Sequence, residues 1–285
     1  MAVLLGLVAF SLLRSPLSQE FRVFTQKSET IRTFSLSISH IYVNANFSET
    51  AAMYGWCSGN GTAEDPYIIQ NLTVDGTYNY LCVQIKNTID FFKIRNCTIL
   101  HSKYDGISLV NTGNGTLENN TIHNNNCNGI SLSNSKNITI KNNIIYRNGD
   151  YLVQYSGIYL TQSNNNSIIN NDISYNGRGG IQLYNSNYNN LTSNIVYNSL
   201  YGISVSSSNY NRIIHNILLN NFDSTVDPYE SVGNVIQNNI QQTKWMPAFF
   251  GVVPLWFMII GGWSITVVAL NKGIKQRRLK DIFPP

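Results

Sequence analysis

The chain has 285 residues, of which only 12% are charged, and a formal net charge of +4. Five basic residues lie in its last 15 positions, so the rest of the chain is close to neutral. That distribution excludes the long basic stripe with which proteins bind nucleic acid. The length leaves room for one large repeat domain but not for a second sizeable domain beside it.

The chain begins with an apolar stretch at residues 2–13. This length suits the core of a signal peptide and is too short to cross a bilayer. We therefore expect residues 1–19 to be a signal peptide and residues 20–75 to form an N-terminal segment that caps the following domain. No basic residue precedes the stretch, so an uncleaved N-terminal anchor is the alternative.

A repeat begins at Ile69. Each of eight copies holds an aliphatic residue, a polar residue two positions later, and another aliphatic residue three positions after that, except that Ile240 comes one residue early in the last copy. The polar positions are Asn71, Asn96, Asn119, Asn142, Asn170, Ser193, His215 and Asn238. Their spacing is close to 23 residues, which is too short for helical hairpins or propeller blades and is typical of a β-solenoid coil.

Aliphatic columns share this period and include pairs two residues apart, such as Ile158/Leu160 and Ile181/Leu183. A spacing of two places both side chains on one face of a short strand. We therefore predict an all-β fold over residues 76–242, a single-stranded parallel β-helix of about eight coils with about three strands each. The Asn column is expected to adopt the left-handed backbone conformation at a corner and to stack its amides between coils.

The segment Met246–Leu270 contains no charged residue and is rich in Phe, Val, Ile and Trp. It is long enough to cross a bilayer, so we predict a transmembrane α-helix there. The basic residues between Lys272 and Lys280 follow it, and the positive-inside rule then places residues 271–285 in the cytoplasm and the solenoid outside. The expected localisation is the cell membrane, with a single pass.

The sequence ahead of the coils resembles a known family. The phrase from Gly59 to Ile69 is similar to the G-x-G-T-x-x-D-P-Y-x-I phrase that leads into the first coil of NosD-like right-handed β-helix proteins. The resemblance extends from Gly55 to Ile240. It implies a right-handed helix of the pectin-lyase-like superfamily, whose members include polysaccharide lyases, hydrolases, epimerases and non-catalytic binding proteins. It also implies the NosD-like alternative of maturing a copper enzyme, and the fold by itself does not choose among these activities.

This same segment has a physical interpretation as the cap of the solenoid. Gly59, Gly61 and Pro66 are expected to turn the chain. Trp56 and Tyr67 are expected to cover the apolar end of the first coil.

A polysaccharide-cleaving enzyme on this fold needs clustered carboxylates, or carboxylate-bound Ca²⁺ with a basic residue nearby. The acidic residues here form no column, and the best patch is Asp223, Asp227 and Glu230 in a predicted loop. Asp227-Pro-Tyr-Glu230 is similar to the D-P-H-E of alginate-type epimerases, but Tyr replaces the His that would transfer a proton. We therefore expect no catalytic residues, and a lyase or epimerase-type enzyme stays the alternative.

Metal binding is a further hypothesis. Cys97-x-x-x-His101 and His123-x-x-x-Cys127 lie near the same corner of adjacent predicted coils, and thiolates with imidazoles suit copper or zinc. Unrelated packing and loop residues would produce the same pattern. We expect no cofactor, with copper or Ca²⁺ as the alternative and His101, His123 and Cys127 as the candidate ligands. The sequence leaves open whether the four cysteines pair or stay free: Cys57, Cys82, Cys97 and Cys127.

Tyrosine is frequent, with 17 residues, and many lie at predicted outward positions. Flat aromatic faces with amide neighbours suit sugar rings, although strands favour exposed tyrosine in any case. We predict that the chain is a non-catalytic surface protein that recognises a glycan or protein, or supports the envelope. The predicted ligand-binding residues are Tyr159, Gln182, Tyr184, Tyr188 and Tyr210.

Asn60, Asn114 and Asn165 are the best glycosylation candidates among the Asn-x-Ser/Thr sequences, because they lie in predicted loops. The expected partners are the cell membrane, through Met246–Leu270, and a surface polysaccharide or another envelope protein. Nucleic acid is not expected as a partner.

Overall fold

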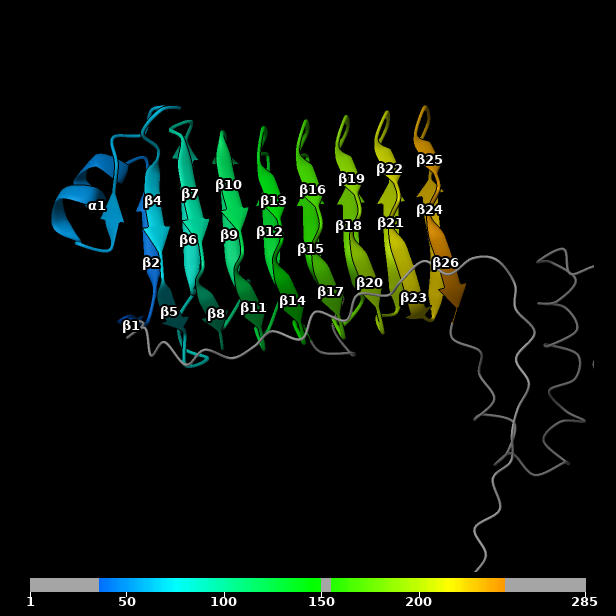
Figure 1. The fold of residues 1–285 in the computed structure, drawn as a ribbon, viewed down its shortest axis with the longest axis horizontal. Helices are drawn as coiled ribbons and strands as arrows, with labels where there is room; N and C mark the ends of the chain where they lie inside the picture. Colours follow the sequence, from blue (N-terminus) through cyan, green and yellow to red (C-terminus); the bar gives the residue numbers. More distant parts are fainter. Residues whose placement is uncertain (1–35, 150–154, 244–285) are drawn as a thin grey trace, which may run out of the picture. The chain divides into compact units, whose positions relative to one another are not determined.

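The computed structural model describes residues 36–149 and 155–243 of the chain. Short strands pass in turn from one sheet to the next, so that successive coils stack on one another (Figure 1). The helix of this described part is α1 (Phe47–Met53). The predicted parallel β-helix is therefore confirmed.

Three sheets run along the stack. The first sheet holds β2 (Ile41–Asn44), β6 (Val83–Thr88), β9 (Ile107–Thr112), β12 (Ile130–Ser133), β15 (Ser156–Thr161), β18 (Gly179–Tyr184), β21 (Tyr201–Ser206) and β24 (Asp223–Tyr229). The second sheet holds β3 (Cys57–Ser58), β4 (Tyr67–Gln70), β7 (Phe92–Arg95), β10 (Gly115–Glu118), β13 (Thr139–Lys141), β16 (Ser167–Ile169), β19 (Asn190–Thr192), β22 (Arg212–Ile214) and β25 (Val235–Gln237). The third sheet holds β1 (Leu36–Ile38), β5 (Leu72–Asp75), β8 (Thr98–Leu100), β11 (Thr121–His123), β14 (Ile144–Tyr146), β17 (Asp172–Ser174), β20 (Ile195–Tyr197), β23 (Ile217–Asn221) and β26 (Ile240–Thr243).

Seven complete coils run from β6 to β26, each in the order first, second and third sheet. The first copy of the repeat, in β4 and β5, belongs to a turn that α1 and β3 interrupt after β2. The stack therefore has about seven complete turns where the repeat predicts about eight. The difference arises because the helix separates the first repeat from its strand in the first sheet.

Aliphatic side chains fill the interior of the coils. Ile158, Ile181 and Ile203 lie directly opposite one another in β15, β18 and β21, and all three are fully buried. The neighbouring Gln182 is half-buried on the outer face, between Tyr159 and Ser204. The predicted register is confirmed.

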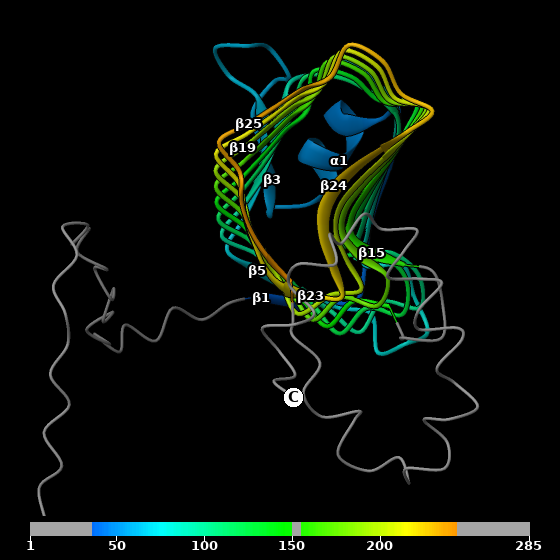
Figure 2. The same cartoon turned by 90° about the vertical axis from the view of Figure 1, so that its right-hand side faces the viewer.

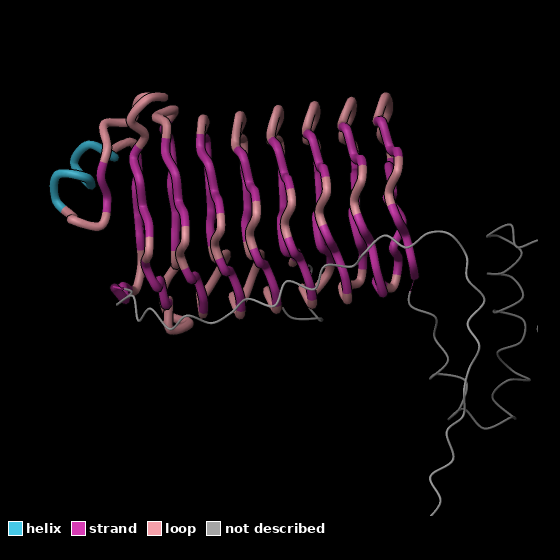
Figure 3. The backbone as a smooth tube through the Cα atoms, in the orientation of Figure 1, coloured by secondary structure: helices cyan, strands magenta, loops and turns pink. Residues whose placement is uncertain are grey.

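At the corner between the second and third sheets, the left-handed backbone and the amide stacking that were expected of one Asn column belong to two adjacent columns. All eight residues of the predicted column have positive φ, between 53° and 58°. From Asn120 onward, the following residue in each coil is the one that stacks its amide in the interior: Asn143 Nδ2 donates to Asn171 Oδ1 at 3.0 Å, and Asn171 Nδ2 donates to Asn194 Oδ1 at 2.9 Å. The left-handed residue turns the chain and its neighbour joins the coils, while the corner loops stay short (Figure 3).

A glycine recurs with the coil period near the start of the strands of the first sheet, and it is required because neighbouring atoms approach closely. The column is Gly106, Gly129, Gly157, Gly180 and Gly202. Gly129 lacks a positive φ, but an added Cβ would lie 2.6 Å from Ile145 Cγ2 and 2.7 Å from the carbonyl oxygen of Gly157. A side chain there would collide with the next coil. Glycine is required because the coils are close together and not because of backbone conformation.

The N-terminal end of the stack is closed by α1, which lies over the interior of the coils in the end view (Figure 2). Phe47 is buried there and stacks on Tyr67 at 4.8 Å and on Phe92 at 5.5 Å between ring centroids. The predicted role of Tyr67 is therefore confirmed, whereas Trp56 stacks on Tyr54 beside the core and Phe47 takes the central position. Phe47 fills it because the helix starts there and aims its first side chain at the open coil.

Within residues 36–149 and 155–243, no helix is long and apolar enough to cross a membrane. The predicted signal peptide at residues 1–19, the predicted span Met246–Leu270 and the basic tail at residues 271–285 all lie outside the described residues. These three assignments remain predictions.

Candidate ligand-binding site

A trough follows the corner between the first and second sheets. In the coil of β12, the turn there consists of Asn134, Ser135, Lys136 and Asn137. Asn134 and Asn137 have φ of 48° and 55° and are exposed, whereas Ser135 between them is buried. The same turn recurs in neighbouring coils, so two polar ridges with a buried hydroxyl column between them extend along the stack.

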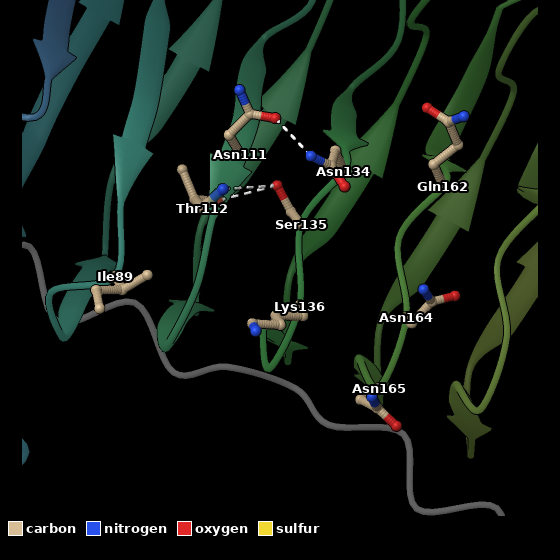
Figure 4. A pocket seen from close by; sticks show the side chains of 9 residues that line it. All are labelled: Ile89, Asn111, Thr112, Asn134, Ser135, Lys136, Gln162, Asn164 and Asn165. Carbon is tan, nitrogen blue, oxygen red and sulfur yellow. Dashed lines mark hydrogen bonds between the residues drawn. The ribbon is translucent and has the colours of Figure 1, made fainter.

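A pocket of about 310 Å³ opens in this trough. Figure 4 shows Asn111, Asn134 and Gln162 in a row on one side and Lys136, Asn164 and Asn165 on the other, with Thr112 and Ser135 between the two rows. It is lined by Ile89, Asn111, Thr112, Asn134, Ser135, Lys136, Gln162, Asn164 and Asn165. Five of these nine side chains carry an amide and two carry a hydroxyl.

Hydrogen bonds between coils fix part of this lining. Asn134 Nδ2 donates to Asn111 Oδ1 at 2.8 Å, and Thr112 Oγ1 lies 3.1 Å from Ser135 Oγ (Figure 4). The Asn134 amide uses Nδ2 for its bond to Asn111, and neither its Oδ1 nor the Gln162 amide makes a hydrogen bond to the described residues. The pocket thus presents one amide that is held in place and one that is adaptable.

The charge of the pocket is positive. Lys136 is its single ionisable lining residue, and this side chain forms no ion pair within the described part of the chain. Its ammonium group is exposed. An anionic group on a ligand would find a partner here without competing with a carboxylate of the pocket.

Two tyrosines extend the rim of the pocket. Tyr188 and Tyr210 occupy the same left-handed column as Asn165, with φ of 57°, 56° and 57° respectively. Their rings are stacked, with centroids 5.3 Å apart and an interplanar angle of 11°, and they are 59% and 55% exposed. The pair, with its rings stacked one coil apart, places a flat aromatic surface next to the amides.

The other predicted binding residues lie on the first sheet beside the trough. Tyr159 is opposite Gln182, and Thr161 is opposite Tyr184, so the two tyrosines are diagonal neighbours on β15 and β18. Tyr184 is exposed, whereas Tyr159 is half-buried. Gln182 Oε1 accepts a hydrogen bond from Ser156 Oγ at 2.7 Å, so that amide is already partly engaged.

The pocket itself was missed by reasoning from the sequence. A signal for it exists, because Asn87, Asn111, Asn134 and Gln162 recur with nearly the coil period, each shortly after an aliphatic pair. That recurrence identifies a polar corner. It does not reveal that neighbouring corners enclose a pocket.

The predicted metal ligands do not assemble into a cluster. His101 Nδ1 lies 3.2 Å from Asp75 Oδ1, while His123 stacks on Tyr146 with ring centroids 4.8 Å apart. His123 Nδ1 is buried without a hydrogen-bond partner, and burial together with nearby positive charges lowers the pKa of this imidazole. In the described ranges, no three side chains of His, Cys, Asp or Glu are placed to hold a metal ion, and Cys127 joins neither histidine.

Two of the three acidic residues considered for catalysis, Asp223 and Asp227, lie in a strand, and Glu230 directly follows it. Asp223–Tyr229 is strand β24, paired with β21, and not the predicted loop. Asp105 is a carboxylate outside this patch whose pKa is shifted. It is half-buried, and burial raises its pKa while hydrogen bonds oppose the rise. Asp105 Oδ1 accepts from both the backbone N and Nδ2 of Asn128 at 2.9 Å, which makes it part of a corner ladder.

The four cysteines are free in the structure. Cys57, Cys82 and Cys97 are buried, and burial raises the pKa of the Cys57 and Cys82 thiols to about 11. Such thiols are weak nucleophiles and poor ligands at neutral pH.

The glycosylation candidates differ in accessibility. Asn60 and Asn165 are exposed, whereas Asn114 is half-buried. Asn114 Nδ2 donates to the carbonyl oxygen of Ile89 at 2.8 Å, so a glycan at Asn114 requires the loss of that bond.

Residues 81–240, more than half of the chain, match the family described as the right handed beta helix region. The chain belongs to this family, and its fold is the right-handed parallel β-helix of pectin-lyase-like proteins. Searching curated proteins finds no match.

Several solved structures are similar to this chain. The enzymatically active domain of tailspike protein 2 from bacteriophage CBA120 is 16% identical over 52% of this chain and 23% of that one, with a TM-score of 0.45. A double mutant of the periplasmic alginate epimerase AlgG is 21% identical over 60% of this chain and 46% of that one, with a TM-score of 0.48. The A-module of the Azotobacter vinelandii mannuronan C-5 epimerase AlgE4 is 17% identical over 62% of this chain and 61% of that one, with a TM-score of 0.45. The chain therefore spans less than two thirds of the length of each.

Proposed function

We propose that this chain is a non-catalytic saccharide-binding protein of the cell surface. The observation that carries the proposal is the corner pocket, where five side-chain amides, two hydroxyls and the Lys136 ammonium lie next to the stacked Tyr188–Tyr210 pair.

The chemistry of the pocket suits a sugar. A sugar ring presents hydroxyl groups that both donate and accept, and side-chain amides offer both functions. The apolar face of a sugar ring packs on flat aromatic surfaces such as Tyr188 and Tyr210. Lys136 favours a saccharide that carries an acidic group. Because the coils hold these groups before a ligand arrives, little ordering entropy is lost on binding.

The proposal includes the place of the protein in the cell. The apolar stretches at residues 2–13 and 246–270 support export followed by anchoring, with the basic tail in the cytoplasm. The pocket would then face the cell exterior, where surface polysaccharides are found.

The test is a glycan array with the purified full-length chain, followed by titration of the best oligosaccharide. Gln162→Ala removes an amide that makes no hydrogen bond within the described chain, so the fold should be unaffected while the Kd rises about fivefold for a lost neutral hydrogen bond. Tyr188→Asn combined with Tyr210→Asn should weaken binding by about tenfold or more. Asn is chosen because it tolerates the left-handed backbone and is the residue of the preceding coil at Asn165.

Tyr175→Asn is the matched control. Tyr175 is also exposed and left-handed, with φ of 54°, but it lies at the corner between the third and first sheets. Unchanged affinity in the Tyr188/Tyr210 variant, or equal loss in the control, would reject the site. New reducing ends or unsaturated sugars produced by the wild type would establish the lyase or epimerase-type alternative. Stoichiometric copper lost in His101→Ala would establish the metal alternative.

A further inference from the structure

Exposed apolar side chains surround the last coil of the stack. Phe222, Tyr229, Val232 and Ile240 are 60–61% exposed, and Val235 is 43% exposed. Tyr229, Val235 and Ile240 belong to β24, β25 and β26, while Phe222 and Val232 lie at two corners. The apolar side chains therefore occupy all three sheets and form a ring, which we call the terminal ring.

The preceding coil is polar at two of the three strand positions of the ring. Val235 is opposite Arg212, and Tyr229 is opposite Ser206, whereas Ile240 is opposite Ile217. The end of a solenoid that faces water is expected to become more polar than its middle, because capping coils keep the apolar interior soluble. At Tyr229 and Val235 the change from one coil to the last runs in the opposite direction, and at Ile240 the position stays apolar.

The two ends of the stack also differ in how they are covered. At the N-terminal end, α1 and β3 lie against the first coil. At the C-terminal end, no described strand pairs with the outer edges of β24, β25 and β26. An open edge next to apolar side chains requires a covering surface.

The sequence that follows the last coil indicates that this covering surface is a membrane. Strand β26 ends at Thr243, and the apolar segment begins at Met246, with Lys244 and Trp245 between them. Three residues reach at most about 11 Å, even fully extended. The headgroup region on one side of a bilayer is roughly 5–7 Å thick. A helix that crosses a bilayer from Met246 therefore holds the last coil at the membrane surface.

We propose that the terminal ring lies in the headgroup region of the bilayer that Met246–Leu270 crosses, so that the β-helix stands on the membrane on its C-terminal end. Asp223 and Glu230 belong to the same coil, so zwitterionic lipids fit this surface better than anionic ones. This orientation holds the pocket at Asn134 four coils away from the membrane, at roughly 19 Å for strands about 4.8 Å apart. The inference rests on the predicted span and is independent of the saccharide proposal.

The test measures the depth of a nitroxide label on the full-length chain in phosphatidylcholine vesicles. Val235→Cys carries the label, in a Cys127→Ser background because the other three native thiols are buried. Thr139→Cys is the matched control, since Thr139 occupies the same column of the second sheet four coils earlier. We expect a higher ratio of oxygen to nickel-chelate collisions at 235 than at 139. Adding Val232→Asn, the residue that the preceding coil carries at Asn209, should lower the ratio at 235.

Other outcomes would overturn the inference. Equal ratios at 235 and 139 in protein that sediments with the vesicles would mean that the span exists but the ring stays in water. Protein that does not sediment with the vesicles would show that the chain does not insert into a bilayer, and the inference would be rejected. A label at 235 that is protected in detergent as well, with spin–spin broadening between copies, would show that a second copy covers the ring.

Discussion

At the corner between the second and third sheets in the coil of β15, the two consecutive asparagines Asn170 and Asn171 have different structural roles. Asn170 accepts a left-handed backbone, with φ of 54°, which few other residues tolerate without strain. Asn171 is buried and links three coils through its amide. We therefore expect mutations at these two adjacent asparagines to have different effects on stability.

We expect Asn170→Gly to change stability little, because glycine adopts positive φ freely. Asn171→Ala should cost about 2–4 kcal/mol, because it removes the bonds from Asn171 Nδ2 to Asn194 Oδ1 and to the Ile140 carbonyl, and leaves buried groups of Asn143 without a partner. Urea unfolding of the two variants measures the difference. Similar losses in both would contradict this division of roles.

The ladder position of Asp105 predicts a pH-dependent effect. Its pKa is raised in the folded state, mainly by burial, so the folded chain favours the protonated carboxyl. The contribution of this group to stability is present below its unfolded pKa of about 3.9 and is lost as pH rises through the higher folded value. Asp105→Asn keeps the acceptor for Asn128 and avoids that loss.

The free energy of unfolding of the variant should therefore exceed that of the wild type near pH 8. Near pH 3.5 the difference between the two proteins should be smaller. Urea titrations of both proteins at the two pH values test the sign. A gain that is the same at both would show that the carboxyl titrates normally in the folded chain.

At the scale of the strand, alternation decides which residues form the core and which form a surface. In β18, Ile181 is buried between its equivalents in two neighbouring coils, while Gln182 lies on the outer face. The same alternation places Tyr184 at the edge of the trough. A register error of one residue would exchange all of these roles.

Ile181→Asp should lower stability by at least about 4 kcal/mol, because it buries an unpaired charge. Gln182→Glu is the control, since it keeps an oxygen acceptor for Ser156 Oγ at a half-buried position and should cost less than about 1 kcal/mol. Thermal unfolding of the two variants provides the measurement. Equal decreases in Tm would be incompatible with the register.

At the scale of the whole chain, the stack has one closed end and one end that leads to the predicted anchor. Coils contact mainly their neighbours, so stability accumulates along the stack and depends on how its ends are covered. The N-terminal end is covered by Phe47 and α1. The C-terminal end continues into Met246–Leu270.

The predicted orientation has a direct test in cells. Protease added to intact cells should remove the β-helix, while a tag placed after Pro285 stays protected, because the basic tail favours the cytoplasm. Permeabilised cells, in which the tag is cleaved, provide the control. Loss of the tag from intact cells with an undamaged β-helix would reverse the orientation.

The repeat in the sequence is enough to determine the coil, because in a solenoid each residue stacks on its own equivalents one period away. Ile181 can be assigned to the core and Asn170 to a corner from spacing alone. The assignment of the amide ladder to Asn171 instead of Asn170 cannot be made in this way, because adjacent residues share the same period and differ only in the direction of their side chains.

The non-repeating features were decided by the tertiary structure. Phe47 belongs to no column, so no periodic signal predicts that α1 closes the first coil. The pocket depends on how far apart the turns of successive coils are held, and the spacing of Asn111, Asn134 and Gln162 in the sequence does not contain that distance. The pattern of His and Cys residues suggested a metal site for the same reason: equal spacing brings residues to the same corner, but the backbone of each turn decides whether their side chains converge.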